Sequence, residues 1–425
     1  MGRSLRSARV TPELIWFVAS APRRADPYPA YRRLQRLDPV HHSPLGVWVL
    51  SRHPEVVAAF RNPALSSDVR HIDSATLHIG PLRRVLGRGG AETETGPFFD
   101  RVPDLMLFQD PPDHTRLRSL ASRAFTQRRV RALEPRIRAI ADDLLDAIER
   151  DGRAELMGAF AYPSPARVIC ELIGVPLVDL HHIVDHAPAL AAGLDPGPLL
   201  TPAARDAANQ AITAITTYLD RLIDGRRAAL GDDLLSALLA KDGDDTLTHD
   251  ELVNTILLLL IAGHETTANL LGNGLIALLD QPDRLAELRR DPALDAAAVD
   301  ELLRFDSPVQ MTMRVATDTV RIAGRTVDPG SIVISAPEPP TTTTAPSPTP
   351  TVSIGTASRT PIWPSAAASI TASVPRSRAP KLASPCARSS TAFQTSPSTE
   401  NRCDDPASPS AVWLRSRCGG VRRVR

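Results

Sequence analysis

The chain has 425 residues, enough for one large domain or two ordinary ones, and its 49 lysines and arginines nearly balance its 48 aspartates and glutamates. A net charge of +1 gives no indication of a nucleic-acid or membrane-surface partner, so we expect a small-molecule substrate. Four scattered cysteines argue against a disulfide framework or a paired-cysteine zinc site and predict a reducing, cytoplasmic compartment. The early apolar stretch Leu14–Ser20 is far too short to cross a bilayer, so no membrane anchor is expected.

Helical periodicity dominates the sequence from Asp26 to Asp306, with apolar residues recurring every three or four positions. The clearest expected helices cover residues 134–149, 203–230, 233–240 and a long apolar segment, 249–279. Strand candidates are residues 47–50 and the pair 314–322 and 326–334, which a turn containing Gly324 separates. These patterns predict a mainly α fold with a small β region.

The composition changes abruptly after Ser335, where Pro, Ser, Thr, Ala and Arg take over and no amphipathic period remains. A segment of this composition cannot bury enough apolar surface to fold. It is either a genuine disordered extension or a translation in the wrong reading frame. We therefore predict an N-terminal extension, 1–25, a folded domain, 26–335, and a low-complexity tail, 336–425.

Residues 262–267, Ala-Gly-His-Glu-Thr-Thr, lie in the middle of the expected long apolar helix. Burying the Glu265 carboxylate there is costly without a partner or a role, and Gly263 weakens the local helix. The acid and the adjacent Thr266 hydroxyl predict a polar notch, although a satisfied buried pair is the plainer alternative. A zinc site would need a second histidine four residues after His264, where Ala268 stands instead.

Two further motifs place charged side chains on common helix faces. In residues 301–304, Glu-Leu-Leu-Arg, the spacing of three brings Glu301 and Arg304 together, as any exposed helix can do. Residues 110–118, Asp-Pro-Pro-Asp-His-Thr-Arg-Leu-Arg, predict a helix that starts near its prolines and carries His114 and Arg118 on one face. Without further context this face is a basic solvated surface.

The three motifs together resemble those of the cytochrome P-450 superfamily, in its soluble bacterial type. Landmarks at residues 26–28, 51–54 and 171–176 follow in the same order and extend the resemblance to about residue 334. The resemblance implies a cytochrome P-450 fold, heme b (iron protoporphyrin IX), and a monooxygenase acting on a small organic substrate. It also implies a ferredoxin or flavodoxin, with its reductase, as electron donor.

The resemblance also assigns residue roles. Ala262 and Gly263 would border the haem at a widened, oxygen-binding turn, where Glu265 and Thr266 would relay protons. The propionates would be held by His114, Arg118 and Arg314. The remaining pair, Glu301 and Arg304, would brace the proximal core.

The family requires a proximal thiolate, from a loop Phe-Gly-x-Gly-x-His-x-Cys-x-Gly, and that loop occurs nowhere in this chain. Cys170 is expected to be an ordinary buried thiol, and Cys386, Cys403 and Cys418 lack the surrounding glycines. Thus no metal ligand is expected in the chain as written, and the fold is truncated after the Glu-x-x-Arg helix and the strands that follow it. Haem binding by this chain is expected to be weak or absent.

A frame slip near Ser335 accounts for the missing loop. If each codon starts one base earlier, residues 362–374 permit His-Leu-Ala-Phe-Gly-Ser-Gly-Ile-His-His-Cys-Leu-Gly, and two other family landmarks become possible within 338–352 and 375–382. The alternative is a haem-less P-450-like helper of another enzyme. A genuine helper would have no cysteine loop in the neighbouring frame.

Overall fold

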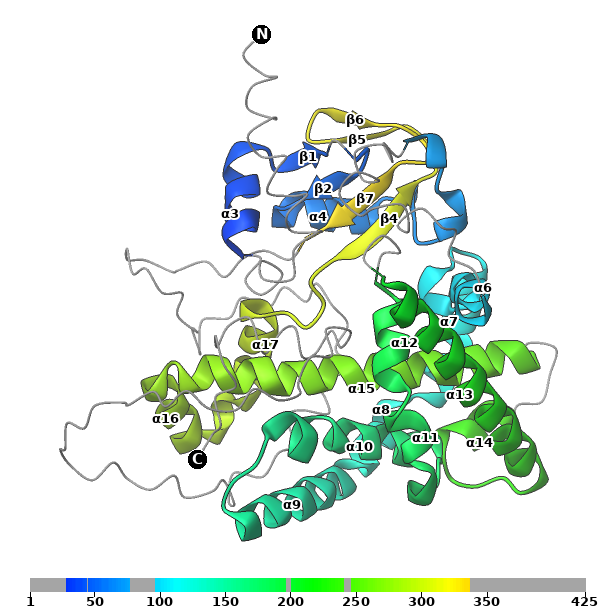
Figure 1. Ribbon diagram of the computed structural model, residues 1–425, viewed down its shortest axis with the longest axis vertical. Helices are drawn as coiled ribbons and strands as arrows, with labels where there is room; N and C mark the ends of the chain where they lie inside the picture. The colour runs from blue at the N-terminus through cyan, green and yellow to red at the C-terminus, as the bar shows by residue number, and fades with distance from the viewer. Residues whose placement is uncertain (1–27, 44, 77–95, 196–199, 241–245, 337–425) are drawn as a thin grey trace.

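The computed structural model describes residues 28–43, 45–76, 96–195, 200–240 and 246–336 (Figure 1). The predicted extension, 1–25, and all but the first residue of the predicted tail lie outside these ranges. The described chain forms a β-rich part, built from its first and last segments, and a larger helical part (Figure 1). The prediction of a mainly α fold with a small β region is confirmed.

The helical part contains the four expected helices, with small shifts at their ends. The long apolar helix α15 has the predicted bounds, because Thr248 and Glu251 form a reciprocal capping box at its start. A five-residue π-helical turn, Met157–Ala161, leads into α10. The helices are α3 (Tyr28–Leu37), α4 (His53–Arg61), α6 (Pro97–Arg101), α7 (Asp113–Ala124), α8 (Gln127–Ala132), α9 (Glu134–Asp151), α10 (Pro163–Ile173), α11 (His181–Val184), α12 (Ala187–Gly193), α13 (Pro202–Ala228), α14 (Leu234–Leu239), α15 (His249–Leu279), α16 (Pro282–Arg290) and α17 (Asp295–Phe305).

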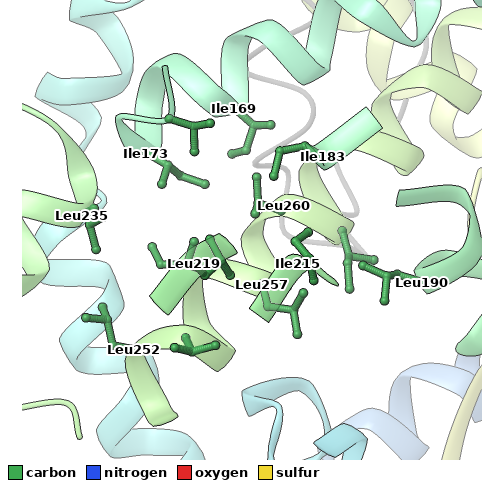
Figure 2. Packing of buried hydrophobic residues seen from close by; sticks show 14 of the residues in the cluster. Ile169, Ile173, Ile183, Leu190, Ile215, Leu219, Leu235, Leu252, Leu257 and Leu260 are labelled. Carbon is green, nitrogen blue, oxygen red and sulfur yellow. The ribbon is translucent and has the colours of Figure 1, made fainter. Parts of the chain in front are cut away.

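The main core lies where α15 crosses α10, α12 and α13. Figure 2 shows its aliphatic side chains converging from these helices, with Ile173 of α10, Leu219 of α13 and Leu257 of α15 all essentially buried. Each such side chain contributes roughly 1.5–3 kcal/mol by leaving water. Although α15 is long and apolar enough to cross a membrane, 67% of its most apolar window is buried inside the protein. Its hydropathy therefore follows from its central place in the core.

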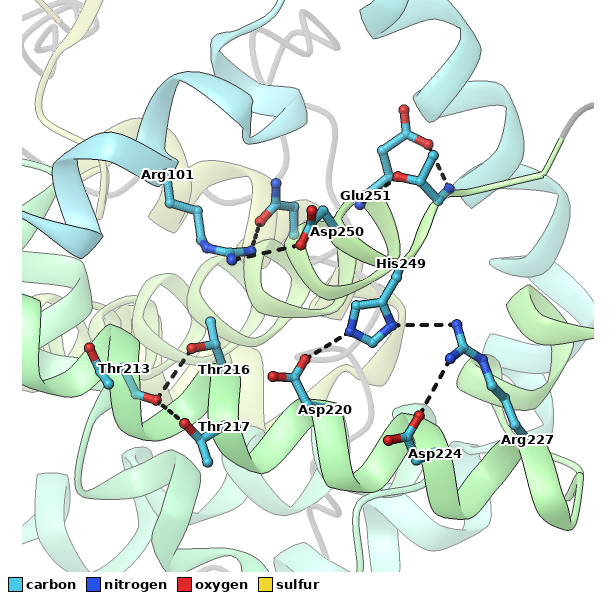
Figure 3. A network of polar contacts seen from close by, with 12 residues as sticks. Arg101, Thr213, Thr216, Thr217, Asp220, Asp224, Arg227, His249, Asp250 and Glu251 are labelled. Atoms are coloured by element: carbon cyan, nitrogen blue, oxygen red, sulfur yellow. Dashed lines mark hydrogen bonds and ion pairs between the residues drawn. The ribbon is translucent and has the colours of Figure 1, made fainter.

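Polar contacts fix the first turn of α15 against α13 and α6 (Figure 3). The His249 imidazole donates from Nε2 to Asp220 Oδ1 at 2.9 Å and accepts at Nδ1 from Arg227 at 3.4 Å. On the other side, Arg101 donates to Asn254 Oδ1 at 2.7 Å. These contacts set the position of α15 along its axis, and hence that of residues 262–267.

The β-rich part has a five-stranded sheet of order β1-β2-β7-β4-β3 and a separate hairpin, β5-β6. Strand β7 pairs parallel with β2 and antiparallel with β4, so the end of the described chain lies in the middle of the sheet. The strands are β1 (Val40–His42), β2 (Trp48–Leu50), β3 (Leu65–Ser66), β4 (Thr312–Ala316), β5 (Val320–Ile322), β6 (Arg325–Val327) and β7 (Ile332–Ser335).

The prediction of two long strands at 314–322 and 326–334 was wrong in detail, because each is interrupted. The first breaks into β4 and β5 at residues 317–319, and the second into β6 and β7 at 328–331. Pro329 has no amide hydrogen to continue a ladder, and Gly330 adopts φ +77°. The turn around Gly324 is present as predicted. It joins β5 to β6, and Ala323 and Gly324 both adopt positive φ.

Candidate functional site

One face of α15 remains open in the middle of an otherwise buried helix. Ala262 is exposed. Leu259, Thr266 and Asn269, which lie three, four and seven residues from Ala262 on the same helix face, are only partly covered. The Thr266 hydroxyl donates to the Ala262 carbonyl at 2.6 Å, and Asn269 Nδ2 donates to Glu265 Oε1 at 3.0 Å. The expected acid and hydroxyl thus lie next to an open, largely apolar surface.

Gly263 does not widen this turn as the sequence led us to expect. The helix α15 is continuous from residue 249 to 279, and a Cβ added at Gly263 would meet Ile169 Cδ1 of α10 at 3.4 Å. The missing side chain therefore faces the packed side of the helix, where it lets α10 approach. The Thr266 hydroxyl, which bonds back to the Ala262 carbonyl within a regular helix, supplies the local polarity.

Three basic side chains, two from α7 and one from β4, lie close enough to act on one another. Burial lowers the pKa of the His114 imidazole, the Arg118 and Arg314 charges lower it further, and the Asp110 carboxylate raises it. Burial also lowers the pKa of the Arg314 guanidinium, while Asp110 raises it. His114 and Arg118 lie on α7 and Arg314 on β4, so the fold brings together the three residues that the resemblance assigned to propionates.

Little negative charge lies close enough to these three basic side chains to balance them. Arg314 donates to the Met313 carbonyl at 2.9 Å and stacks over the Phe60 ring at 4.9 Å. Within the described ranges, none of His114, Arg118 and Arg314 has an ion pair within 4.0 Å. A group with two carboxylates would stabilise such a cluster through charge-assisted hydrogen bonds.

Glu301 and Arg304 of α17 form the pair that their spacing predicts. The guanidinium donates from Nε to Oε2 and from Nη2 to Oε1, both at 2.7 Å. The Glu301 side chain is 2% exposed and that of Arg304 40%, so the carboxylate is buried under a fork-shaped bidentate contact. This geometry suits a fixed internal brace better than a solvated surface pair.

The remaining reactive groups have structural surroundings. Cys170 is fully buried in the α10 core, where burial raises the pKa of its thiol to about 12, as expected of an inert thiol. Cys386, Cys403 and Cys418 lie outside the described residues. Within the part of the chain that the structure describes, no group of three His, Cys, Asp or Glu side chains could hold a metal ion.

Two residues without an assigned role in the sequence predictions are prominent in the structure. His264, weighed only as a zinc ligand, is fully buried and bonds through Nε2 to the Tyr162 carbonyl at 3.1 Å. Asp110, quoted only as part of a motif, is the acid whose charge raises the pKa of both His114 and Arg314. Neither role could be seen in the local sequence. Asp110 contacts Ser66, 44 residues earlier, and His264 contacts Tyr162, 102 residues earlier.

The described residues fit part of a haem site. The cation cluster suits two propionates, and the open face of α15 suits the oxygen-binding side of a flat, apolar ring. The thiolate that would ligate the iron is not among them, since Cys170 is sealed in the core.

Comparison with known proteins agrees with this geometry. Residues 192–338 match the family model described as cytochrome P-450. The vitamin D(3) 25-hydroxylase of Pseudonocardia autotrophica is 42% identical over 73% of this chain and 72% of its own length. The cytochrome P-450 monooxygenase PikC of Streptomyces venezuelae is 39% identical over 73% of this chain and 70% of its own.

A solved structure shows the same fold. Mycobacterium smegmatis CYP164A2 with econazole bound aligns with a TM-score of 0.70 and 34% identity, over 85% of this chain and 90% of its own. Members of this family are haem-dependent oxidoreductases. The chain belongs to the cytochrome P-450 family.

Proposed function

We propose that the gene encodes a haem-dependent monooxygenase of a small organic substrate, and that this chain holds the propionate-binding and oxygen-side parts of its site. The observation that carries the proposal is the convergence of His114, Arg118 and Arg314. Separately, the middle of α15 leaves Ala262 exposed and Thr266 partly covered. When bound through a thiolate, the haem supplies oxidative chemistry with dioxygen. The protein supplies position, charge and protons.

The residues of this chain have distinct tasks in the proposal. His114, Arg118 and Arg314 bind and orient the propionates, and Glu301 with Arg304 braces the proximal core. Thr266, whose hydroxyl bonds the Ala262 carbonyl, presents an exchangeable proton at the open face. Glu265, held by Asn269, resupplies that proton, because a carboxyl group exchanges protons with water readily at neutral pH. Ala262 keeps the exposed helix surface flat and close to the ring, while Gly263 lets α10 pack against the other side of α15.

We further propose that the printed sequence departs from the functional reading frame near Ser335. The neighbouring frame permits the missing cysteine loop within residues 362–374, in the family's order relative to the two landmarks permitted within 338–352 and 375–382. On this proposal the present chain lacks the iron ligand, binds haem weakly or not at all, and is inactive. The frame-restored protein would be cytoplasmic and would receive electrons from a ferredoxin or flavodoxin with its reductase.

Sequencing the DNA across the Ser335 codon tests the frame proposal. We expect a one-base difference that restores Phe-Gly-x-Gly-x-His-x-Cys in phase with residues 26–335. If the DNA matches the printed chain and the adjacent frame offers no cysteine codon in that loop, the monooxygenase proposal fails.

The alternative function is a haem-less helper of another enzyme, and the absent cysteine loop favours it. The retained Glu265 and Thr266, together with the three cations, argue against long-standing loss of haem chemistry. A haem titration of the frame-restored chain separates the two. If the protein is a monooxygenase, haem binds stoichiometrically, and the affinity falls at least tenfold when His114, Arg118 and Arg314 are all replaced by Ala. If it is a helper, haem shows no saturable binding.

A further inference from the structure

Asp110 lies between the two elements that carry the cation cluster. It immediately precedes the Pro-Pro step that opens α7, and its carbonyl accepts the His114 amide at 3.0 Å. Its side chain turns away from α7 toward β3, a strand more than 40 residues earlier in the sequence. One residue therefore contacts both the helix of His114 and Arg118 and the sheet that contains Arg314.

The Asp110 carboxylate is held by an ordered set of donors. Oδ1 accepts the Ser67 backbone amide at 2.9 Å, and Oδ2 accepts the Ser66 hydroxyl through a short contact. The Ser66 Oγ in turn accepts the Asp68 amide at 2.8 Å, which directs its own hydrogen toward Asp110. Ser66 is 2% exposed and the Asp110 side chain is 35% exposed, so water reaches this hydrogen bond only from the Asp110 side. Charge-assisted bonds of this kind are the stronger ones in proteins.

The pairing of β3 with β4 links the Asp110–Ser66 contact to Arg314. Ser66 pairs with Val315 of β4, the residue next to Arg314. Because β3 and β4 are adjacent, a shift of Asp110 relative to Ser66 changes the separation between α7 and the Arg314 backbone. The Asp110 charge also acts on both cations, since it raises the pKa of His114 and of Arg314.

We propose that Asp110 is a positioning residue that ties the His114 and Arg118 helix to the Arg314 strand and so sets the spacing of the three cations. This inference rests on the proposed haem role for its meaning, but the tie itself exists in the chain without haem. A tie of this kind differs from simple anchoring of the loop at residues 66–71. A loop anchor would order only that loop, whereas a tie orders β3 and the start of α7 together.

The test uses the full 425-residue chain and three variants. Asp110→Asn keeps the side-chain shape and one acceptor but removes the charge, and Ser66→Ala removes the hydroxyl donor while keeping the charge. The matched control is Asp113→Asn, which removes the same charge three residues later, from an exposed side chain without a hydrogen bond to Ser66 or Ser67. Urea unfolding of each variant reports global stability separately.

Hydrogen exchange of residues 65–73 and 110–118 is the first readout. We expect both segments to exchange at least about tenfold faster in Asp110→Asn and in Ser66→Ala, with the parental rate in Asp113→Asn. The second readout is the His114 pKa from histidine NMR, assigned with His114→Gln. Here Asp110→Asn should lower the pKa, because it removes the nearby negative charge, and Ser66→Ala should change it far less.

Two results would overturn the proposal. One is faster exchange confined to residues 65–73 with the start of α7 unchanged, which would mean a loop anchor only. The other is a His114 pKa that is the same in Asp110→Asn and the parent. Neither readout involves haem, so failure of the tie is distinguishable from failure of the haem titration described above.

Discussion

The backbone amide of Ala336 donates to the Leu50 carbonyl at 2.9 Å, so the last described residue extends the parallel pairing of β7 with β2. Ala336 is buried, although the sequence analysis placed it at the start of the tail. The described strand pairing of the five-stranded sheet therefore reaches up to the proposed frame slip near Ser335.

Removing the Arg304 guanidinium should destabilise the protein. Arg304→Leu deprives the buried Glu301 carboxylate of its bidentate partner, and we expect the free energy of unfolding to fall by about 2 kcal/mol, less than for a fully buried pair because Arg304 is 40% exposed. Urea unfolding monitored by circular dichroism measures this change. The control is Arg284→Leu, which breaks an exposed pair with Glu287 of the same spacing and should cost about 0.5 kcal/mol or less. Equal losses in the two variants would contradict a bracing role for Arg304.

Two glycine substitutions should have opposite effects. In Gly263→Ala the new Cβ makes ordinary contact with Ile169, and the helix gains up to about 1 kcal/mol in propensity, so stability should be unchanged or slightly higher. Gly174→Ala places a Cβ 2.4 Å from Asp233 Cγ at φ +95°, and should cost at least about 2 kcal/mol. Thermal and urea unfolding compare the two. A large loss in Gly263→Ala would mean that the glycine is needed for a backbone shape absent from the regular helix.

The buried His264 should make stability depend on pH. Burial lowers the pKa of this imidazole in the folded protein, so between about pH 6.5 and the lower folded value the unfolded chain binds a proton that the folded chain does not. The stability is thus fully present above about pH 6.5 and falls as the pH drops below it, by at most about 1.4 kcal/mol per pH unit. Urea unfolding at several pH values between 7.5 and 5 measures the slope.

The His264 contribution is isolated by substitution. His264→Gln should be less stable than the parent at pH 7.5 but should lose less on acidification. His181→Gln, at an exposed site, is the control and should keep the parental slope. An unchanged slope in His264→Gln would show that this histidine does not titrate with folding.

Cys170 should resist modification in the native protein. Its thiol is fully buried and its pKa is raised to about 12 by burial, so little thiolate exists at neutral pH. Mass spectrometry of the peptide that contains Cys170, after alkylation with iodoacetamide, should show no label in buffer and full label in concentrated urea. Rapid native labelling would place Cys170 in an accessible pocket and reopen its role.

The long helix and the charged pairs could be predicted from the sequence because their signals are local. Thr248 and Glu251 mark the start of α15, and the spacing of Glu301 and Arg304 is enough to bring them together. The two strand breaks were missed although residues 328–331, Asp-Pro-Gly-Ser, carry a turn signal, because the flanking β-branched residues were read as single long strands. The break at 317–319 is a bend with a weaker local signal. The tie between Asp110 and Ser66 could not be predicted, since it depends on the register of β3 with β4.

The Gly263 prediction shows a different limit. The sequence places a glycine next to the acid and the hydroxyl, but only the packing reveals that its open side faces Ile169. The direction in which a helical residue points depends on which neighbour the helix contacts. A motif gives the residues of a site, and the tertiary contacts decide which of them face it.

The most direct test of the haem assignment is the reduced carbon monoxide difference spectrum, recorded for the printed chain and for its frame-restored counterpart. We expect a thiolate-ligated Soret band from the frame-restored protein and no such band from the printed chain. A thiolate-type band from the printed chain, or none from a folded, haem-reconstituted frame-restored protein, would contradict it.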